Sequence, residues 1–188
     1  MENKINFIKE SIYDIQSTIR VIDTKVGVVF LILLAPLSNI GKIANHCVAM
    51  LSKTPVLISF TLLLGFLFFW ASALYLAARV ISAIDNPSDH IDMSGHTVTG
   101  VYYSGGLYNA TFRDVWFNTL RSQSKLSFNN HLENFPADYQ QIEKELVYEQ
   151  MKLVYIREVK FSRLNSSISM IRNWLFFGAV IYLVSRFL

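Results

Sequence analysis

The stretch Pro55–Ala78, PVLISFTLLLGFLFFWASALYLAA, carries no charged side chain. At about 1.5 Å per residue, a helix of this length exceeds the roughly 30 Å thickness of the hydrocarbon core of a bilayer. The stretch therefore predicts a membrane-spanning helix. The composition of the whole chain agrees, because 52% of the 188 residues are hydrophobic and only 16% are charged, which is too little charge to cover a soluble globule.

A second span is expected before this stretch. Residues 26–50 are apolar apart from a polar patch at 38–42 and the pair Asn45 and His46. Pro36 lies inside the run, and because proline lacks a backbone N–H we expect a kink there. Lys42 can extend its ammonium group to the headgroups if it lies towards the far interface.

A third span is predicted at the C-terminus, where residues 173–185 form an apolar run between Arg172 and Arg186. This run alone is about two-thirds of a usual span, so an interfacial helix or a buried core helix is the alternative. Counting from Ile168 to Leu188 gives about 21 residues, which is enough to cross the bilayer.

The basic residues are unevenly distributed along the chain. The N-terminal segment and the long connection 79–172 hold 14 of the 17 Lys and Arg, whereas Lys42, Lys53 and Arg186 make up the rest. Because Lys and Arg near spans favour the cytoplasmic side, the N-terminus and the connection are expected in the cytoplasm and the C-terminus outside. No basic stripe suited to a nucleic acid polymer occurs.

Residues 1–25 predict a cytoplasmic amphipathic helix. Its isoleucines alternate steps of three and four residues, a heptad pattern that continues into the first span. Two partners remain open for this apolar face, namely the second cytoplasmic helix of the same chain or further copies in a trimeric or tetrameric coiled coil. The isoleucines are Ile5, Ile8, Ile12, Ile15, Ile19 and Ile22.

A second cytoplasmic helix is expected to begin near residues 135–138, where a proline and an acid suit a helix start. No Gly or Pro interrupts residues 138–174, so this helix can run unbroken into the third span. Both cytoplasmic helices then enter the membrane in the same direction and pack in parallel. Matching depths favour an ion pair between Asp23 and Arg172, with a solvated belt of charges as the alternative.

The insert at residues 83–134 is turn-rich, with a short helix expected over about 112–123. No nucleophile, base and orienting group stand at a recognisable spacing, so we expect no enzyme and no cofactor. The spacing of its acids and histidines matches no structural metal site, so a hydrated polar loop and no bound metal are expected. The residues weighed as metal ligands are Asp85, Asp89, His90, Asp92 and His96.

The predicted fold is therefore an all-α membrane protein with three transmembrane helices, long cytoplasmic helical extensions and a small mixed, turn-rich insert. The predicted boundaries are 1–25 for the first cytoplasmic helix, 26–51 and 54–82 for the first two spans, 83–134 for the insert, 135–168 for the second cytoplasmic helix and 169–188 for the third span.

Several short motifs stand in a distinctive order. Asp23-Thr24-Lys25 opens the first span, Val101-Tyr102-Tyr103 follows the hairpin of spans and a linker, and Lys160-Phe161-Ser162-Arg163-Leu164 leads towards the last span. In this order the chain resembles, over nearly its whole length, the transmembrane effectors of the bacterial Pycsar antiphage systems. The resemblance implies that cyclic UMP or cyclic CMP binds the cytoplasmic region and that an oligomeric rearrangement of the spans then disrupts the inner membrane.

A cyclic nucleotide needs an aromatic face for its base and a cation for its phosphate. Residue chemistry nominates five ligand contacts, although the aromatic residues could instead form the core of a small cytoplasmic bundle. A passive oligomeric membrane pore or scaffold without a small-molecule ligand is the alternative function. The nominated residues are Tyr102, Tyr103, Arg113, Lys160 and Arg163.

Overall fold

The computed structural model describes residues 2–82, 86–95, 98, 100–101, 124–125 and 127–187. The chain divides into two compact units. We call Met1–Gln16 together with Asn86–Tyr155 the extramembrane unit, and Ser17–Asp85 together with Ile156–Leu188 the membrane unit.

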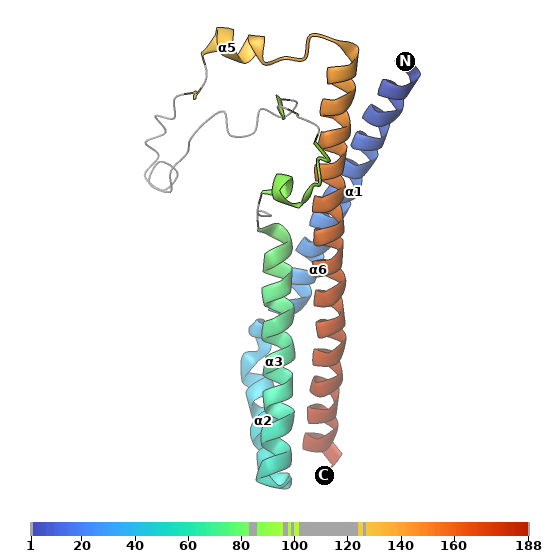
Figure 1. Ribbon diagram of the computed structural model, residues 1–188. Coiled ribbons are helices and arrows are strands. Elements are labelled where there is room, and N and C mark those ends of the chain that lie inside the picture. The colour runs from blue at the N-terminus through green and yellow to red at the C-terminus, as the bar shows by residue number, and fades with distance from the viewer. Residues whose placement is uncertain are drawn as a thin grey trace. The chain divides into compact units, whose positions relative to one another are not determined.

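Helices account for almost all regular structure in the described residues (Figure 1). Three helical stretches, Asn3–Lys53, Val56–Ile81 and Tyr139–Phe187, are long and apolar enough to cross a membrane. The prediction of a helical protein with three such stretches is therefore confirmed. The elements are α1 (Glu2–Leu34), η1 (Ala35–Asn39), α2 (Ile40–Lys53), α3 (Val56–Ile81), η2 (Pro87–His90), α5 (Phe128–Glu133) and α6 (Tyr139–Phe187).

The start of α6 lies slightly later than expected. The Asp138 carboxylate accepts a hydrogen bond from the Gln141 amide at 2.7 Å, which is the contact of an N-cap residue. Pro136 therefore precedes the helix and does not form part of its first turn. From Tyr139 the helix runs unbroken to Phe187, and its continuity into the third span was predicted from the lack of Gly and Pro over residues 138–174.

Among its described residues, the insert contains two short helices that sequence reasoning missed, η2 and α5. The six-residue α5 begins after Ser127, whose side chain accepts a hydrogen bond from the Asn130 amide at 3.2 Å. The helix predicted over about 112–123 lies outside the described residues.

Gly95 and Gly100 have φ angles of 80° and 69°, so both occupy the left-handed region that glycine adopts most easily.

The expected kink at Pro36 takes the form of a short 3-10 segment, η1, between α1 and α2. Proline lacks the N–H that the Ile32 carbonyl would otherwise accept. At this break the indole N–H of Trp70 donates to the Leu33 carbonyl at 3.0 Å. A side chain of α3 thus supplies a hydrogen bond where the helical ladder of the first span is interrupted.

In the extramembrane unit, α1 lies in parallel beside the first part of α6. Lys4 pairs with Glu143, and Gln150 donates to the Ser11 hydroxyl at 2.7 Å, so partners on the two helices are 139 residues apart in both cases. Four isoleucines of α1 are buried in this unit, and Leu146 of α6 is buried with them. The isoleucine face is thus covered within the chain; the buried isoleucines are Ile5, Ile8, Ile12 and Ile15.

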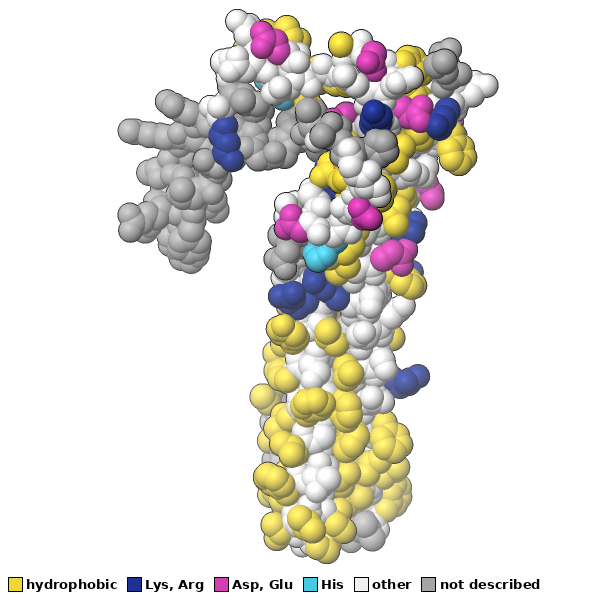
Figure 2. Space-filling model, in the orientation of Figure 1, with side chains coloured by type: hydrophobic (Ala, Val, Ile, Leu, Met, Phe, Trp, Pro, Cys, Tyr) yellow, Lys and Arg dark blue, Asp and Glu magenta, His cyan; other side chains and the backbone are white. Residues whose placement is uncertain are grey.

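In the membrane unit, α1, α3 and α6 share one apolar core. Ser167 of α6 donates to the Ala73 carbonyl of α3 at 2.9 Å inside it, a polar contact of the kind that holds spanning helices together. Figure 2 shows hydrophobic side chains over the outer surface of this unit as well, which suits contact with lipid. The core residues are Ile22, Val26, Val29, Leu33, Ala73, Ala77, Val80, Leu164, Ile171 and Trp174.

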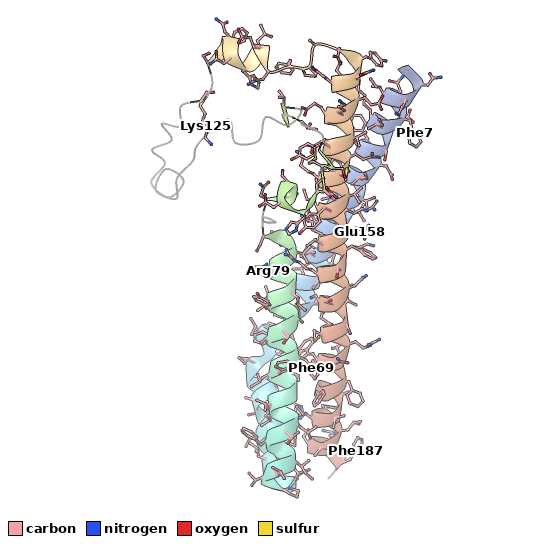
Figure 3. The ribbon with its side chains drawn as sticks, viewed as in Figure 1. Phe7, Phe69, Arg79, Lys125, Glu158 and Phe187 are labelled. Atoms are coloured by element: carbon pink, nitrogen blue, oxygen red, sulfur yellow. The ribbon has the colours of Figure 1, made fainter. Side chains whose placement is uncertain are left out.

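Two glycines let α3 and α6 approach each other closely. A Cβ atom added to Gly65 would lie 2.4 Å from the Phe177 ring, and one added to Gly178 would lie 3.2 Å from the Phe66 ring. Each helix therefore places a phenylalanine over a glycine of the other. Phe69, labelled in Figure 3, adds to this contact with its ring centroid 5.3 Å from that of Phe177.

Candidate functional site

Of the five ligand contacts nominated from the sequence, Tyr102, Tyr103 and Arg113 lie outside the described residues. Lys160 and Arg163 are described, and both belong to the membrane unit. They lie about one turn apart on α6, near the polar end of the apolar core.

Lys160 pairs with an acid of its own chain. Its ammonium nitrogen lies 2.5 Å from the Asp23 carboxylate of α1, and its side chain is only 13% exposed. The predicted pair of Asp23 with Arg172 is therefore wrong. At this contact the paired residues of α1 and α6 are 137 positions apart in the sequence, whereas a pair between Asp23 and Arg172 would require a separation of 149 positions.

Arg163 also contacts its own chain. Its guanidinium donates to the Arg79 carbonyl at 2.7 Å, close to the C-terminal end of α3. A cation at this end of a helix satisfies a carbonyl and meets the negative end of the helix dipole. Arg163 and Lys160 thus tie α6 to α3 and α1, and a ligand phosphate would have to compete with these contacts.

The extramembrane unit offers a better candidate in a cavity of about 350 Å³, which we call the turn cavity. One wall comes from one face of α6, where Lys144, Tyr148 and Met151 are spaced four and three residues apart. The other wall is a tight turn in which the Ser94 amide donates to the Asp92 carboxylate at 2.9 Å. The lining residues are Asp92, Met93, Ser94, Val98, Glu143, Lys144, Val147, Tyr148 and Met151.

A second cavity of about 350 Å³ shares Lys144 and Val98 with the turn cavity. Its remaining lining comes from the end of α5, the connection to α6 and the first turns of α6. The Lys144 side chain is exposed and borders both cavities, so its ammonium group can serve either. The further lining residues are Glu133, Asn134, Phe135, Pro136, Gln141 and Glu145.

A buried carboxylate anchors the insert next to these cavities. Glu145 is 6% exposed, and its two oxygens accept hydrogen bonds from the Gly100 and Val101 amides, both at 3.2 Å. Hydrogen bonds from backbone amides to a carboxylate are stronger than those between neutral groups. The insert is therefore attached to α6 at this point by its backbone.

Tyr148 is held in place on one side. The Lys152 ammonium lies 4.8 Å from the centre of the Tyr148 ring, and it also pairs with Glu149 at 2.5 Å. These contacts orient the ring, since a cation over an aromatic face attracts it. His90 stacks on Tyr155 with ring centroids 4.7 Å apart, which gives the polar loop a packed position in the same unit.

Within the described part of the chain, no three His, Cys, Asp or Glu side chains gather as a metal site would require. Two of the residues weighed as ligands, Asp85 and His96, lie outside that part. The turn cavity instead combines one cation, one aromatic ring and several acceptors. Such a set can bind a small polar organic molecule that carries a ring and a single negative charge.

Sequence reasoning did not nominate Lys144 or Tyr148. The i, i+4, i+7 spacing with Met151 was a signal that these residues share a face of α6. Which segment lies opposite that face depends on the path of the insert, and no local pattern predicts that path.

No protein family model, curated protein or solved structure matches the chain.

Proposed function

We propose that this protein is an oligomeric membrane effector that binds a cyclic pyrimidine mononucleotide in its extramembrane unit and then permeabilises a bacterial inner membrane. The observation that supports this best is the combination of three helices able to span a membrane with a separate unit that holds cavities of ligand size. Helices α1 and α6 contribute residues to both units. A ligand that binds at the cavities therefore contacts a helix that continues into a spanning segment.

Lys144 and Tyr148 are the proposed anchors for the ligand. The ammonium group of Lys144 would pair with the cyclic phosphate, and the Tyr148 ring offers an apolar surface to the pyrimidine base. Asp92 can accept a hydrogen bond from the ribose hydroxyl. Glu143 is already paired with Lys4, which lowers its repulsion of the phosphate.

Binding alone does not open a membrane protein, because a ligand shifts only an equilibrium between states that it binds differently. The proposed second state is an assembly of several copies. The buried isoleucine face of α1 is not free to form its seam, so the exposed faces of the spanning helices would have to supply the contacts.

Calorimetry in detergent tests the ligand. Cyclic UMP or cyclic CMP should bind at micromolar concentrations and raise the molecular mass of the particle measured by light scattering, whereas cyclic AMP and cyclic GMP serve as comparison ligands. A folded protein that binds none of the four would contradict the proposal and leave the passive pore or scaffold as the better account.

We expect Lys144→Ala to weaken nucleotide binding about tenfold or more, because a charge-assisted contact to phosphate contributes roughly 1.5 to 3 kcal/mol. Lys125→Ala is the matched control, since Lys125 is an exposed lysine that lines neither described cavity. If Lys144→Ala binds as tightly as the wild type, the ligand lies elsewhere, and Lys160→Ala and Arg163→Ala become the next variants to measure.

The proposed orientation has its own test. The N-terminus is expected inside and the C-terminus outside, because 14 of 17 basic residues lie on the side assigned to the cytoplasm. A periplasm-specific reporter fused after Leu188 should be active, and a cytoplasm-specific reporter should not. The opposite pattern would contradict the combination of this orientation with three spans.

A further inference from the structure

Arg172 lies deep in the membrane unit. On α6 it stands midway between Ser167, which contacts Ala73 of α3, and Phe177, which packs on Gly65. Its level on α3 is therefore close to Phe69, near the middle of the charge-free stretch Pro55–Ala78 (Figure 3). Along α6 it is nine residues beyond Arg163, which corresponds to about 14 Å.

The Arg172 side chain points away from the core. It is exposed, whereas Ile171 and Trp174 on either side are buried. No described residue forms an ion pair or a hydrogen bond with its guanidinium group. Inserting an arginine at the centre of a spanning helix is unfavourable, so an ionisable residue at this depth calls for a functional explanation.

A second copy of the chain cannot neutralise Arg172 at that depth. The sequence contains no Asp or Glu between Asp23 and Asp85, and none after Glu158. The spans of every copy therefore lack a carboxylate at this level. The counter-charge must come from a lipid phosphate or from an anion in water.

Arg172 is the deepest member of a polar strip on α6. Asn165 and Ser169 lie seven and three residues before it, and these intervals place them on the same side of the helix. Asn165 is exposed and Ser169 is half-buried. Polar groups thus lead from the membrane edge to mid-depth, where an apolar surface would suit lipid better.

We propose that the strip formed by Asn165, Ser169 and Arg172 lines a water-filled path in the assembled protein, and that Arg172 makes this path select anions over cations. The inference rests on the proposed function, since it requires an assembly that permeabilises the membrane. Water solvates the guanidinium groups, and a ring of arginines contributed by several copies attracts small anions, as charged rings do in anion pores.

Reversal potentials in planar bilayers under a potassium chloride gradient test the inference, with cyclic UMP and cyclic CMP as the activating probes. The wild type should prefer chloride over potassium. Arg172→Gln should abolish the preference, and Arg172→Glu should reverse it. Lys42→Gln is the control and should keep the chloride preference. Lys42 lies one turn from His46, whose ring contacts Ser185 near the end of α6, so it is not part of the strip.

A variant that keeps the positive charge separates charge from folding. Arg172→Lys keeps the positive charge and should therefore retain the chloride preference. Conductance whose chloride preference survives in Arg172→Gln, or is lost in Arg172→Lys, would overturn the inference and leave the function standing. Lipid phosphates would then be the counter-ions of Arg172. A wild type that conducts with neither nucleotide would overturn the proposed function together with the inference.

Discussion

Replacing Ile12 with Asp should detach α1 from α6 in the extramembrane unit and lower its free energy of unfolding by several kcal/mol. Ile12 is only 3% exposed, and it lies one residue from Ser11, which bonds to Gln150 of α6. A carboxylate buried there would have no partner and would have to be charged in an apolar site or protonated, both at high cost. Thermal unfolding in detergent and protease cleavage of the N-terminal helix measure the loss.

Tyr13→Asp is the matched control, because Tyr13 is the next residue of the same helix and is 72% exposed. Its free energy of unfolding should be close to that of the wild type. Crosslinking of oligomers distinguishes the two interpretations of the isoleucine pattern. If the isoleucines pack within the chain, Ile12→Asp should lose crosslinked oligomers only to the extent that the extramembrane unit unfolds. If Ile12→Asp keeps its stability and loses only its oligomers, the isoleucines form an intersubunit seam and the packing described above is wrong.

Gly65→Ala should destabilise the membrane unit by about 1 to 3 kcal/mol, the usual cost of overfilling a packed contact. The new methyl group would lie 2.4 Å from the Phe177 ring, so either the ring or the helices must move. This loss opposes the gain of about 1 kcal/mol that alanine normally brings over glycine inside a helix. Unfolding in mixed micelles of increasing denaturing detergent content measures the difference.

Gly27→Ala and Gly41→Ala separate the two effects. Neither glycine has any atom near the position of an added Cβ, so both variants should be neutral or more stable than the wild type. Phe177→Leu combined with Gly65→Ala should recover part of the loss, because the smaller side chain leaves room for the methyl group. Equal stability of Gly65→Ala and Gly41→Ala would show that α3 and α6 do not depend on this close approach.

Much of the fold follows from residue patterns alone. Charge-free length predicts α3, the isoleucine spacing predicts α1 and its buried face, and the lack of Gly and Pro over residues 138–174 predicts that α6 continues into the third span. These are local properties of the chain, set by hydrogen bonding within one helix and by the transfer of side chains from water to an apolar phase. Even the kink at Pro36 is local, because the missing N–H belongs to a single residue.

The choice of partners is not local, and here prediction was weaker. Depth matching assigned Asp23 to Arg172, whereas the register of α1 against α6 brings it to Lys160. Lys160 and Arg163 were nominated for a ligand because they are cations, and the structure shows both bound to groups of their own chain. Lys144 was passed over, although it borders two cavities.

The amino-acid sequence by itself determined that this chain forms helices, how many can cross a membrane, and which face of the first helix is buried. Only the tertiary structure decided which of the two partners covers that face, where α3 and α6 touch through Gly65 and Gly178, and that Arg172 is exposed with no partner among the described residues. The physical reason is that helix formation depends on neighbours along the chain, whereas register, cavities and unmatched charges depend on how side chains far apart in sequence fill the same space.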